Sequence, residues 1–318
     1  MNPNTQNEWT LAEPQPLDQN AATVYLASLP AETGKRTQAQ ALRVIAQVLG
    51  TDLDRLNWGA LRYQHTAAIR AKMAQVYKPA TANKMLSALR QTLKQAWLLG
   101  QMTAEEYRRA ANLKPIKGET LPAGRELSQG EILALMNTCQ DDPSNAGTRD
   151  AAIIGLMYAA GLRRDEVVRL DVPDLDPETG MLVIHGKRNK ERTPFITNGA
   201  LEALNDWLAI RGESGSSLFV TINKGGKLDS SHGMTSQAIY NMFVKRAQEA
   251  GIKNFSPHDI RRTFISHLLD AGADIATVSK MAGHANIQTT ARYDRRPEET
   301  KRTAAELLHV PYKTRKAG

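Results

Sequence analysis

One stretch without hydrophobic period divides this chain of 318 residues into two halves, each of which carries a helical pattern. The stretch, 114–125, reads KPIKGETLPAGR, and its proline, glycine and lysine are typical of a linker between domains. A chain of this length forms one large or two ordinary domains, so the linker predicts two. We expect a flexible polar arm over 1–18, a first domain over 19–113 and a second over 126–318.

The first domain is predicted to be all-helical, because apolar residues recur in it at helical spacing. Its last segment predicts a buried stripe, followed by a glycine that ends the helix. The stripe is Leu86, Leu89, Leu93 and Trp97, and the glycine is Gly100. Arg90 and Lys94 lie one turn apart beside this stripe, where they form either a solvated flank or a pair of phosphate contacts.

The formal net charge of +8 favours a nucleic-acid partner, since a basic surface attracts phosphate backbones regardless of sequence. Charge alone is weak support, because many basic proteins never bind nucleic acid. No secretion signal and no apolar run near the ~20 residues of a membrane helix occur, so we expect a cytosolic protein without a membrane partner. The single cysteine, Cys139, excludes an internal disulfide and is expected to be half-buried.

The second domain is predicted to be mainly helical with one small β element, which makes the fold class mainly α with a β-hairpin (α+β). The runs MLVIH (181–185) and TPFIT (193–197) have strand composition, and the basic segment GKRNKER (186–192) between them is expected to form the turn. A short helix that begins at Pro297 and a basic tail are expected to end the chain.

Charged residues cluster at two helix junctions of the second half. In SPHDIRRTF, Ser256 is a suitable N-cap and Pro257 a suitable first residue, so His258 and Arg261 share one face of the first turns. A helix N-terminus with these side chains attracts a phosphate, although such a pair is more often solvated or satisfied in a core. Arg163, in GLRRDEV, lies at the junction of two predicted helices.

Four motifs together resemble those of the tyrosine recombinases, or phage integrase family, and in form they are nearest to Xer-type recombinases and mobile-element integrases. They are GLRRDEVVRL, HGKRNKERTPF, SPHDIRRTFISHLL and GHANIQTTARYD, in family order and with family-like separations. The resemblance covers the second half, which it implies is the catalytic domain. The first half is similar only in general form to the family's helical core-binding (SAM-like) DNA-binding domain.

The resemblance implies a catalytic set, carried over position by position: Arg163, Lys187, His258, Arg261, His284 and Tyr293. Glu166 matches the family's supporting acidic residue, and Arg188 and Lys190 of the hairpin turn are expected to contact DNA together with Arg90 and Lys94. Relatives often have His at Arg262 and Gly at Arg188, and neither departure removes a member of the set.

The implied reaction is transesterification of a DNA phosphodiester, in which the Tyr293 oxygen attacks phosphorus and a DNA 5′ hydroxyl leaves. The covalent 3′-phosphotyrosyl intermediate conserves the bond energy, so no ATP is needed. Arg163 and Arg261 would stabilise the charge on the non-bridging oxygens, and His258 is the candidate base for the phenol. The resemblance assigns the acid to Lys187.

His284 would donate a hydrogen bond to the phosphate, and no metal or other cofactor is expected, because the cationic side chains supply the electrostatics. A metal site of His258, His267 and His284 is disfavoured, since no acidic or cysteine partner joins them at ligand spacing. Three other tyrosines fit the nucleophile less well, because they are expected in the core, in helix packing and in the basic tail, respectively: Tyr158, Tyr240 and Tyr312.

Two other functions compete with recombination: a DNA-binding regulator without catalysis, and a type IB topoisomerase that relaxes supercoils alone. The complete catalytic set disfavours the first, and the separate amino-terminal domain and terminal helix disfavour the second. Integration or excision of a mobile element, Xer-like dimer resolution and inversion all remain open as the biological role, although the short spacing from Lys187 to His258 disfavours integron integrases.

The resemblance also implies partners and a location. These are a double-stranded DNA recombination site, a homotetramer on synapsed DNA and accessory proteins, in the bacterial cytoplasm or nucleoid. The terminal helix would dock either into a neighbouring protomer or onto its own domain, through Ala304, Leu307 and Leu308.

Overall fold

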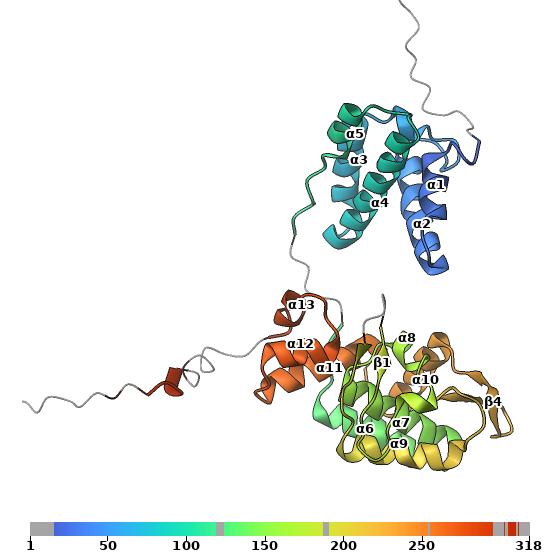
Figure 1. Ribbon diagram of the computed structural model, residues 1–318, viewed down its shortest axis with the longest axis vertical. Coiled ribbons are helices and arrows are strands. Elements are labelled where there is room, and N and C mark those ends of the chain that lie inside the picture. Colours follow the sequence, from blue (N-terminus) through green and yellow to red (C-terminus); the bar gives the residue numbers. More distant parts are fainter. Residues whose placement is uncertain are drawn as a thin grey trace, which may run out of the picture. The chain divides into compact units, whose positions relative to one another are not determined.

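The computed structural model describes residues 16–118, 124–186, 191–253, 255–294, 302, 305–309 and 311 (Figure 1). The chain divides into two compact units, Met1–Ala123 and Gly124–Gly318, at a point inside the stretch 114–125. Most of the described residues are helical and the strands form small antiparallel sheets, which confirms the predicted fold class. None of the described helices is both long and apolar enough to span a bilayer.

The first unit is built around one central helix. Its helices are α1 Ala21–Ala27, α2 Glu32–Val48, α3 Tyr63–Val76, α4 Pro79–Leu98 and α5 Ala104–Ala111, with a 3-10 turn, η1, at Trp58–Ala60. Helix α4 packs against each of the other four. The first turn of α4 starts with Pro79, and Gly100, in the left-handed region at φ +73°, follows its end.

The predicted stripe on α4 is correct in three of its four members. Leu86, Leu89 and Leu93 are fully buried, but Trp97 is 37% exposed. Its ring stacks on that of Tyr107 from α5, with centroids 5.4 Å apart, at the edge of the core. The helical spacing is correct, but the hydrophobic core does not extend to the last turn of the helix, where Trp97 lies.

The beginning of the predicted linker is fixed to the first unit. The Arg70 side chain donates from Nε to the Lys114 carbonyl over 2.7 Å, and Asn83 exchanges two hydrogen bonds with the backbone of Ile116. Arg90 donates to the carbonyl oxygen of Leu113. The linker therefore begins later than its composition predicts, because side chains of α3 and α4 bind its first carbonyls.

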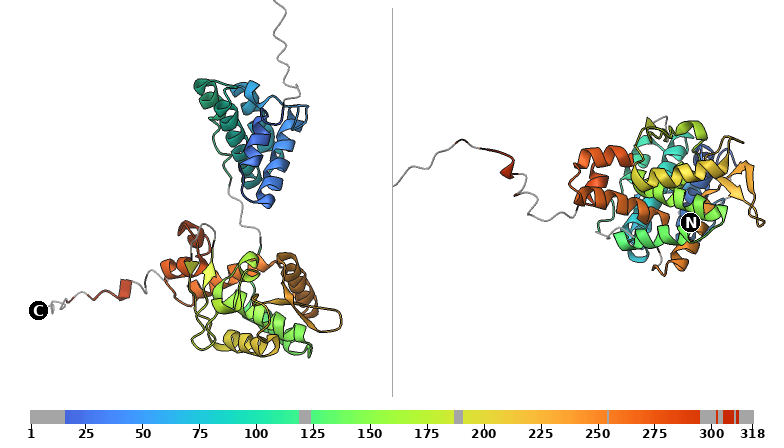
Figure 2. Two further views of the ribbon diagram at one scale, coloured as in Figure 1. Left: turned by 45° about the vertical axis from the view of Figure 1, so that its right-hand side comes forward. Right: turned by 90° about the horizontal axis from the view of Figure 1, so that it is seen from below.

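The second unit surrounds the buried helix α7 (Figure 2). In chain order its helical elements are α6 Gln129–Gln140, α7 Asn145–Ala160, α8 Arg164–Val167, η2 Val172–Asp174, α9 Asn198–Arg211, α10 Ser236–Glu249, α11 Pro257–Asp270, α12 Ile275–Ala282 and α13 Gln288–Ala291. Its strands are β1 Ile184–His185, β2 Glu191–Arg192, β3 Val220–Ile222 and β4 Leu228–Gly233. Helices α12 and α13 lie at one end of this unit and the β3–β4 hairpin at the other.

The predicted hairpin is present, with its second strand displaced. Strands β1 and β2 pair antiparallel through Ile184 with Arg192 and His185 with Glu191, and a further bridge joins Met181 to Phe195. Glu191 and Arg192, predicted to belong to the turn, are thus strand residues. The last two residues of the basic segment belong to the strand because they pair with Ile184 and His185. They alternate as strand residues do, with Glu191 exposed and Arg192 turned inward.

Candidate active site

A buried guanidinium holds two helix ends together at the centre of the site. Arg261, in the second turn of α11, is 2% exposed, and it donates to the carbonyl oxygens of Gly161 and Ala282. These carbonyls lie at the C-termini of α7 and α12, where the helix dipole is negative. Burial, and then the like charge of Arg163, lower the pKa of Arg261 to about 9, so the side chain remains charged near neutrality.

Glycine is required at both of these helix ends for a steric reason. Gly161 has φ +58°, and a Cβ there would lie 2.4 Å from the Phe264 ring. Gly283 has φ +63°, and a Cβ there would lie 3.0 Å from Nη1 of Arg192. Each backbone therefore turns left-handed and approaches a neighbour closely, which a side chain would prevent.

One carboxylate joins two arginines from different elements. Glu166 of α8 is 7% exposed and accepts from the Arg163 backbone N–H and from Arg163 Nη1, both over 2.8 Å. It also accepts from Arg192 Nη1 over 3.0 Å and Nη2 over 2.7 Å. Burial alone would raise the pKa of Glu166, but the hydrogen bonds from Arg192 and Arg163 hold it at about 2.

A buried threonine holds His284 in one orientation. His284 Nδ1 lies 2.8 Å from the hydroxyl oxygen of Thr290, which is fully buried. Burial, and then the charges of Arg261 and Arg163, lower the pKa of His284 to about 4, so the imidazole is neutral at neutral pH. A neutral imidazole carries one proton, and the Thr290 hydroxyl can either donate to Nδ1 or accept from it.

His258 and Tyr293 border the same arginines. The His258 side chain reaches solvent, and partial desolvation followed by the Arg261 charge lowers its pKa. Tyr293, which follows α13, is half-buried, and the Arg262 guanidinium lies 5.5 Å from its ring centroid. The residue that departs from the family's usual histidine thus contacts the aromatic ring by a cation–π interaction.

A cavity of about 690 Å³ opens beside this cluster, and its lining includes Arg163, Glu166, Arg192 and His284. Five of the six predicted catalytic residues therefore come together: Arg163, Arg261, His258, His284 and Tyr293. Three predicted residues lie outside the part of the chain that the structure describes: Lys187, Arg188 and Lys190. In the first unit, Lys94 is exposed and Arg90 is half-buried.

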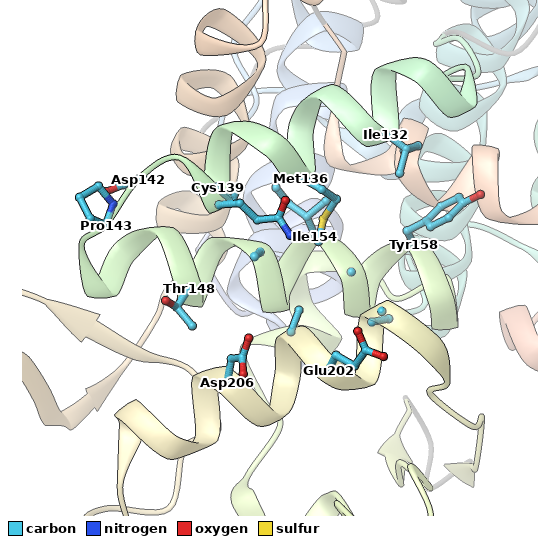
Figure 3. Close-up of a pocket in the computed structure, with 16 residues that line it drawn as sticks. Ile132, Met136, Cys139, Asp142, Pro143, Thr148, Ile154, Tyr158, Glu202 and Asp206 are labelled. Atoms are coloured by element: carbon cyan, nitrogen blue, oxygen red, sulfur yellow. The ribbon is translucent and has the colours of Figure 1, made fainter.

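A second cavity, of about 550 Å³, lies between α6, α7 and α9 and contains none of the predicted catalytic residues (Figure 3). Cys139 lines it but is 1% exposed rather than half-buried, and burial raises the pKa of its thiol to about 12. Tyr158 also lines it, half-buried rather than in the core, with its hydroxyl 2.8 Å from His267 Nδ1.

The other predictions outside the site have mixed outcomes. Tyr240, predicted as packing, is 39% exposed, with the Arg164 guanidinium over its ring. No group of three potential metal-binding side chains occurs among the described residues. At the carboxyl end, Leu307 and Leu308 are 82% and 80% exposed, while Ala304 and Tyr312 lie outside the described residues.

Two residues of this site, Arg192 and Thr290, are absent from the set predicted from the sequence. Arg192 stands inside the quoted motif HGKRNKERTPF, but its inward position follows from its place in β2, and the second strand was predicted to begin only at residue 193. The alternation of Glu191 and Arg192 directly before the predicted strand 193–197 was the signal that could have indicated this inward position. Thr290 had no signal, because its hydroxyl meets His284 only through the turn that precedes α13.

Comparisons with known proteins bear on the family and the fold of this chain. The model of the phage integrase family matches residues 125–299. The tyrosine recombinase XerC of Shewanella amazonensis is 31% identical over 249 residues, 76% of this chain and 79% of that protein. The XerC of Corynebacterium efficiens is 36% identical over 169 residues, 52% of each chain.

Among solved structures, the fold is similar to that of the Tn1549 transposon integrase in complex with transposon right end DNA. The TM-score is 0.71 with 15% identity, and the alignment covers 92% of this chain and 98% of that one.

Proposed function

The chain belongs to the phage integrase family of tyrosine recombinases, and on that premise we propose that Tyr293 is the nucleophile with which it cuts and rejoins DNA. It is a site-specific DNA recombinase, a strand-transferring enzyme. The observation that carries the proposal is that Arg163, Arg261 and His284 lie close to one another and to Tyr293, beside a cavity that Arg163 and His284 line.

Arg163 and Arg261 would bind the non-bridging oxygens of the scissile phosphate. Arg261 is fixed by two carbonyls, and Glu166 fixes Arg163, so both donors are oriented before DNA arrives. Donors placed in advance stabilise developing charge without the cost of reorganisation. The pentacoordinate transition state, in which negative charge grows on phosphorus oxygens, is the species that this arrangement favours.

His284 would donate to the same phosphate while neutral. For its Nε2 to carry the proton, Nδ1 must accept from the Thr290 hydroxyl, which is consistent with their 2.8 Å separation. In this arrangement the Thr290 hydroxyl would stabilise the tautomer that carries the proton on Nε2. His258 would accept the Tyr293 proton, since its lowered pKa keeps it unprotonated at neutral pH. The acid for the leaving 5′ oxygen would be Lys187, on the resemblance alone.

The DNA partner is proposed as a recombination site bound by both units. The Tn1549 integrase is a protein solved with DNA, and the basic charge of this chain favours the same class of ligand. Exchange between two sites needs four active sites, so we propose a tetramer on synapsed DNA. Leu307 and Leu308 would contribute to the tetramer by docking on a neighbouring protomer. Deletion of the chain after Asp294 tests this, because it should abolish synapsis and leave cleavage intact.

A covalent trapping experiment tests the function directly. Wild-type protein is mixed with fragmented genomic DNA in chelator, and DNA that stays attached under denaturing conditions is recovered and sequenced. We expect one recurring sequence from wild type and none from Tyr293→Phe. Tyr240→Phe is the matched control, because it removes another partly exposed hydroxyl away from the site and should trap as wild type does.

Reversible binding by wild type without any trapped DNA, with plasmid dimers and partner extracts also supplied, would contradict the proposal and favour the non-catalytic regulator. Trapping together with relaxation of supercoils, and without joining of two sites, would favour the topoisomerase. Loss of trapping in chelator, with recovery on adding a divalent ion, would contradict metal independence.

A further inference from the structure

Arg192 has no role in the proposed reaction, although it makes an extensive contact within the site. Its guanidinium meets Glu166 with two parallel hydrogen bonds, Nη1 to Oε1 over 3.0 Å and Nη2 to Oε2 over 2.7 Å. The side chains are only 13% and 7% exposed, respectively. A bidentate pair of this kind fixes the plane of the carboxylate as well as its distance.

The same carboxylate sets the position of Arg163. Oε1 of Glu166 accepts from Arg163 Nη1 and Oε2 accepts from the Arg163 backbone N–H, both over 2.8 Å. Each carboxylate oxygen thus accepts one hydrogen bond from Arg163 and one from Arg192. A rotation of the carboxylate away from the plane of the Arg192 fork would therefore move or break the bond that orients the Arg163 side chain.

Arg192 is itself held from two further directions. It belongs to strand β2, paired with Ile184 of β1, and its guanidinium lies against Gly283. A Cβ at Gly283 would come within 3.0 Å of Nη1, 3.2 Å of Cδ and 3.3 Å of Cζ of Arg192. The hairpin, helix α8 and the turn before His284 therefore meet at one side chain.

We propose that Arg192 is a positioning residue for strand cleavage, which acts through Glu166 to aim Arg163 at the scissile phosphate. The inference rests on the proposed function, because it requires that Arg163 bind that phosphate. Arg192 itself does not touch the reacting atoms. Its contribution is that Arg163 is already oriented when DNA binds, with its remaining N–H groups directed to the cavity rather than distributed over rotamers.

The first test measures single-turnover formation of the covalent complex on a duplex with the sequence recovered by trapping, at saturating protein. Arg192→Ala should slow cleavage by about a hundred-fold, as misplacement of a catalytic group does. The dissociation constant for DNA should change by less than about three-fold, since one partly buried charge contributes little to overall attraction. Arg192→Lys keeps the charge but lacks the fork, and should recover only part of the rate.

The matched control is Arg169→Ala. Arg169 lines the same cavity and is exposed, and it lies outside the four hydrogen bonds of Glu166 described above. Its loss should slow cleavage by less than about ten-fold, well short of the effect of Arg192→Ala, because Arg169 does not orient the Glu166 carboxylate. Equal slowing by Arg169→Ala and Arg192→Ala would mean that cavity charge, and not the fork on Glu166, is what matters, and would overturn the proposal.

A double-mutant cycle tests the route through Glu166. If Arg192 acts through that carboxylate, adding Arg192→Ala to Glu166→Gln should cost less than about three-fold, although it costs about a hundred-fold in wild type. Multiplicative losses would show independent roles and overturn the proposal. Because Arg192→Ala breaks a buried ion pair, Arg192→Lys serves for the same cycle if the alanine variant does not fold.

A substrate with altered charge separates positioning from a general loss of structure. Replacing one non-bridging oxygen of the scissile phosphate by methyl removes the charge that Arg163 would neutralise. The penalty of Arg192→Ala should then shrink by about ten-fold or more, as that of Arg163→Ala should. A penalty of equal size on both substrates would mark Arg192 as merely structural. Wild type that cleaves neither duplex contradicts the proposed function itself, whereas wild-type cleavage matched by Arg192→Ala contradicts only this inference.

Discussion

The two units bury different kinds of side chain. In the described part of the first unit, the buried polar residues are Asn20, Thr66 and Thr92, and none is charged. The second unit buries acidic and basic side chains: Asp150, Glu166, Arg211, Arg246, Asp259, Arg261 and Arg262. Apolar burial needs only the right pattern, whereas buried charges are tolerated only when each has its partners in place.

The comparison shows where preorganisation is located. The first unit is a helical bundle whose stability comes from a stripe of leucines, and its basic side chains remain near the surface. The second unit places its arginines inside and binds them with carbonyls and carboxylates from separate elements, as at Arg261 and Arg246. We expect substitutions in the two units to change different quantities, stability in the first and chemistry in the second.

The largest effect is expected at Arg261. Arg261→Lys keeps the charge but cannot bind the carbonyls of Gly161 and Ala282 while pointing to phosphate, and it should lower single-turnover cleavage by about 10²–10³-fold. The control is Arg211→Lys, at a buried guanidinium that binds loop carbonyls away from the cavity. It should lower the melting temperature but not the cleavage rate; equal loss of rate would remove the distinction between the two roles.

In the first unit, the core leucine Leu89 should dominate stability. Leu89→Ala should lower the free energy of unfolding by about 2–5 kcal/mol, through lost burial and a residual cavity. Leu98→Ala, on the same helix but at a side chain that is 61% exposed, should change it by less than about 0.5 kcal/mol. Denaturant unfolding followed by circular dichroism measures both, and similar losses at the two positions would contradict the assignment of the core.

Acid should weaken the second unit more than the first. The pKa of His284 is about 4 in the folded chain and 6.5 unperturbed, so between these values the unfolded chain holds the extra proton. Stability is therefore complete above pH 6.5 and falls towards pH 4, by at most about 1.4 kcal/mol per pH unit for one proton. Glu166 adds a second loss below its unperturbed value of 4.5, because its folded pKa is about 2.

His65 in the first unit also has a lowered pKa, from burial and then Arg62, so the two units differ in the size of the effect and not in its sign. Calorimetry at stepped pH measures the loss of stability of each unit. His284→Gln should flatten the dependence between pH 6.5 and 4, and an unchanged slope in that variant would show that another group is responsible.

The smallest effect is expected at the predicted DNA contacts of the first unit. Lys94→Gln should reduce the slope of log affinity against log salt by about one, with only a few-fold loss of affinity near 0.1 M salt. Lys72→Gln, at an exposed lysine on α3, is the matched control, and an equal change there would mean that Lys94 contributes only diffuse charge. Arg90→Gln should instead cost about 1 kcal/mol of stability, because Arg90 binds the Leu113 carbonyl.

Most helices and several residues of the site were predictable from the sequence alone. Helical spacing located the leucines of α4, the cap at Ser256 located the start of α11, and the motifs identified Arg163, Glu166 and His284, which line the cavity. These features are local, because a helix pattern or a turn residue acts within a few positions of the chain. The same locality explains the error at Trp97, where the spacing continues but the core beneath it does not.

The contacts that hold the site together are visible only in the folded chain. The partners of Arg261 are backbone carbonyls 100 and 21 residues away. The pattern of side chains does not indicate which carbonyls a buried arginine will bind. Arg192 reaches Glu166 across 26 residues, and a shift of the hairpin register by one residue would turn it to the opposite face. Which charged groups meet is set by how separate elements pack, and a one-dimensional pattern does not contain that information.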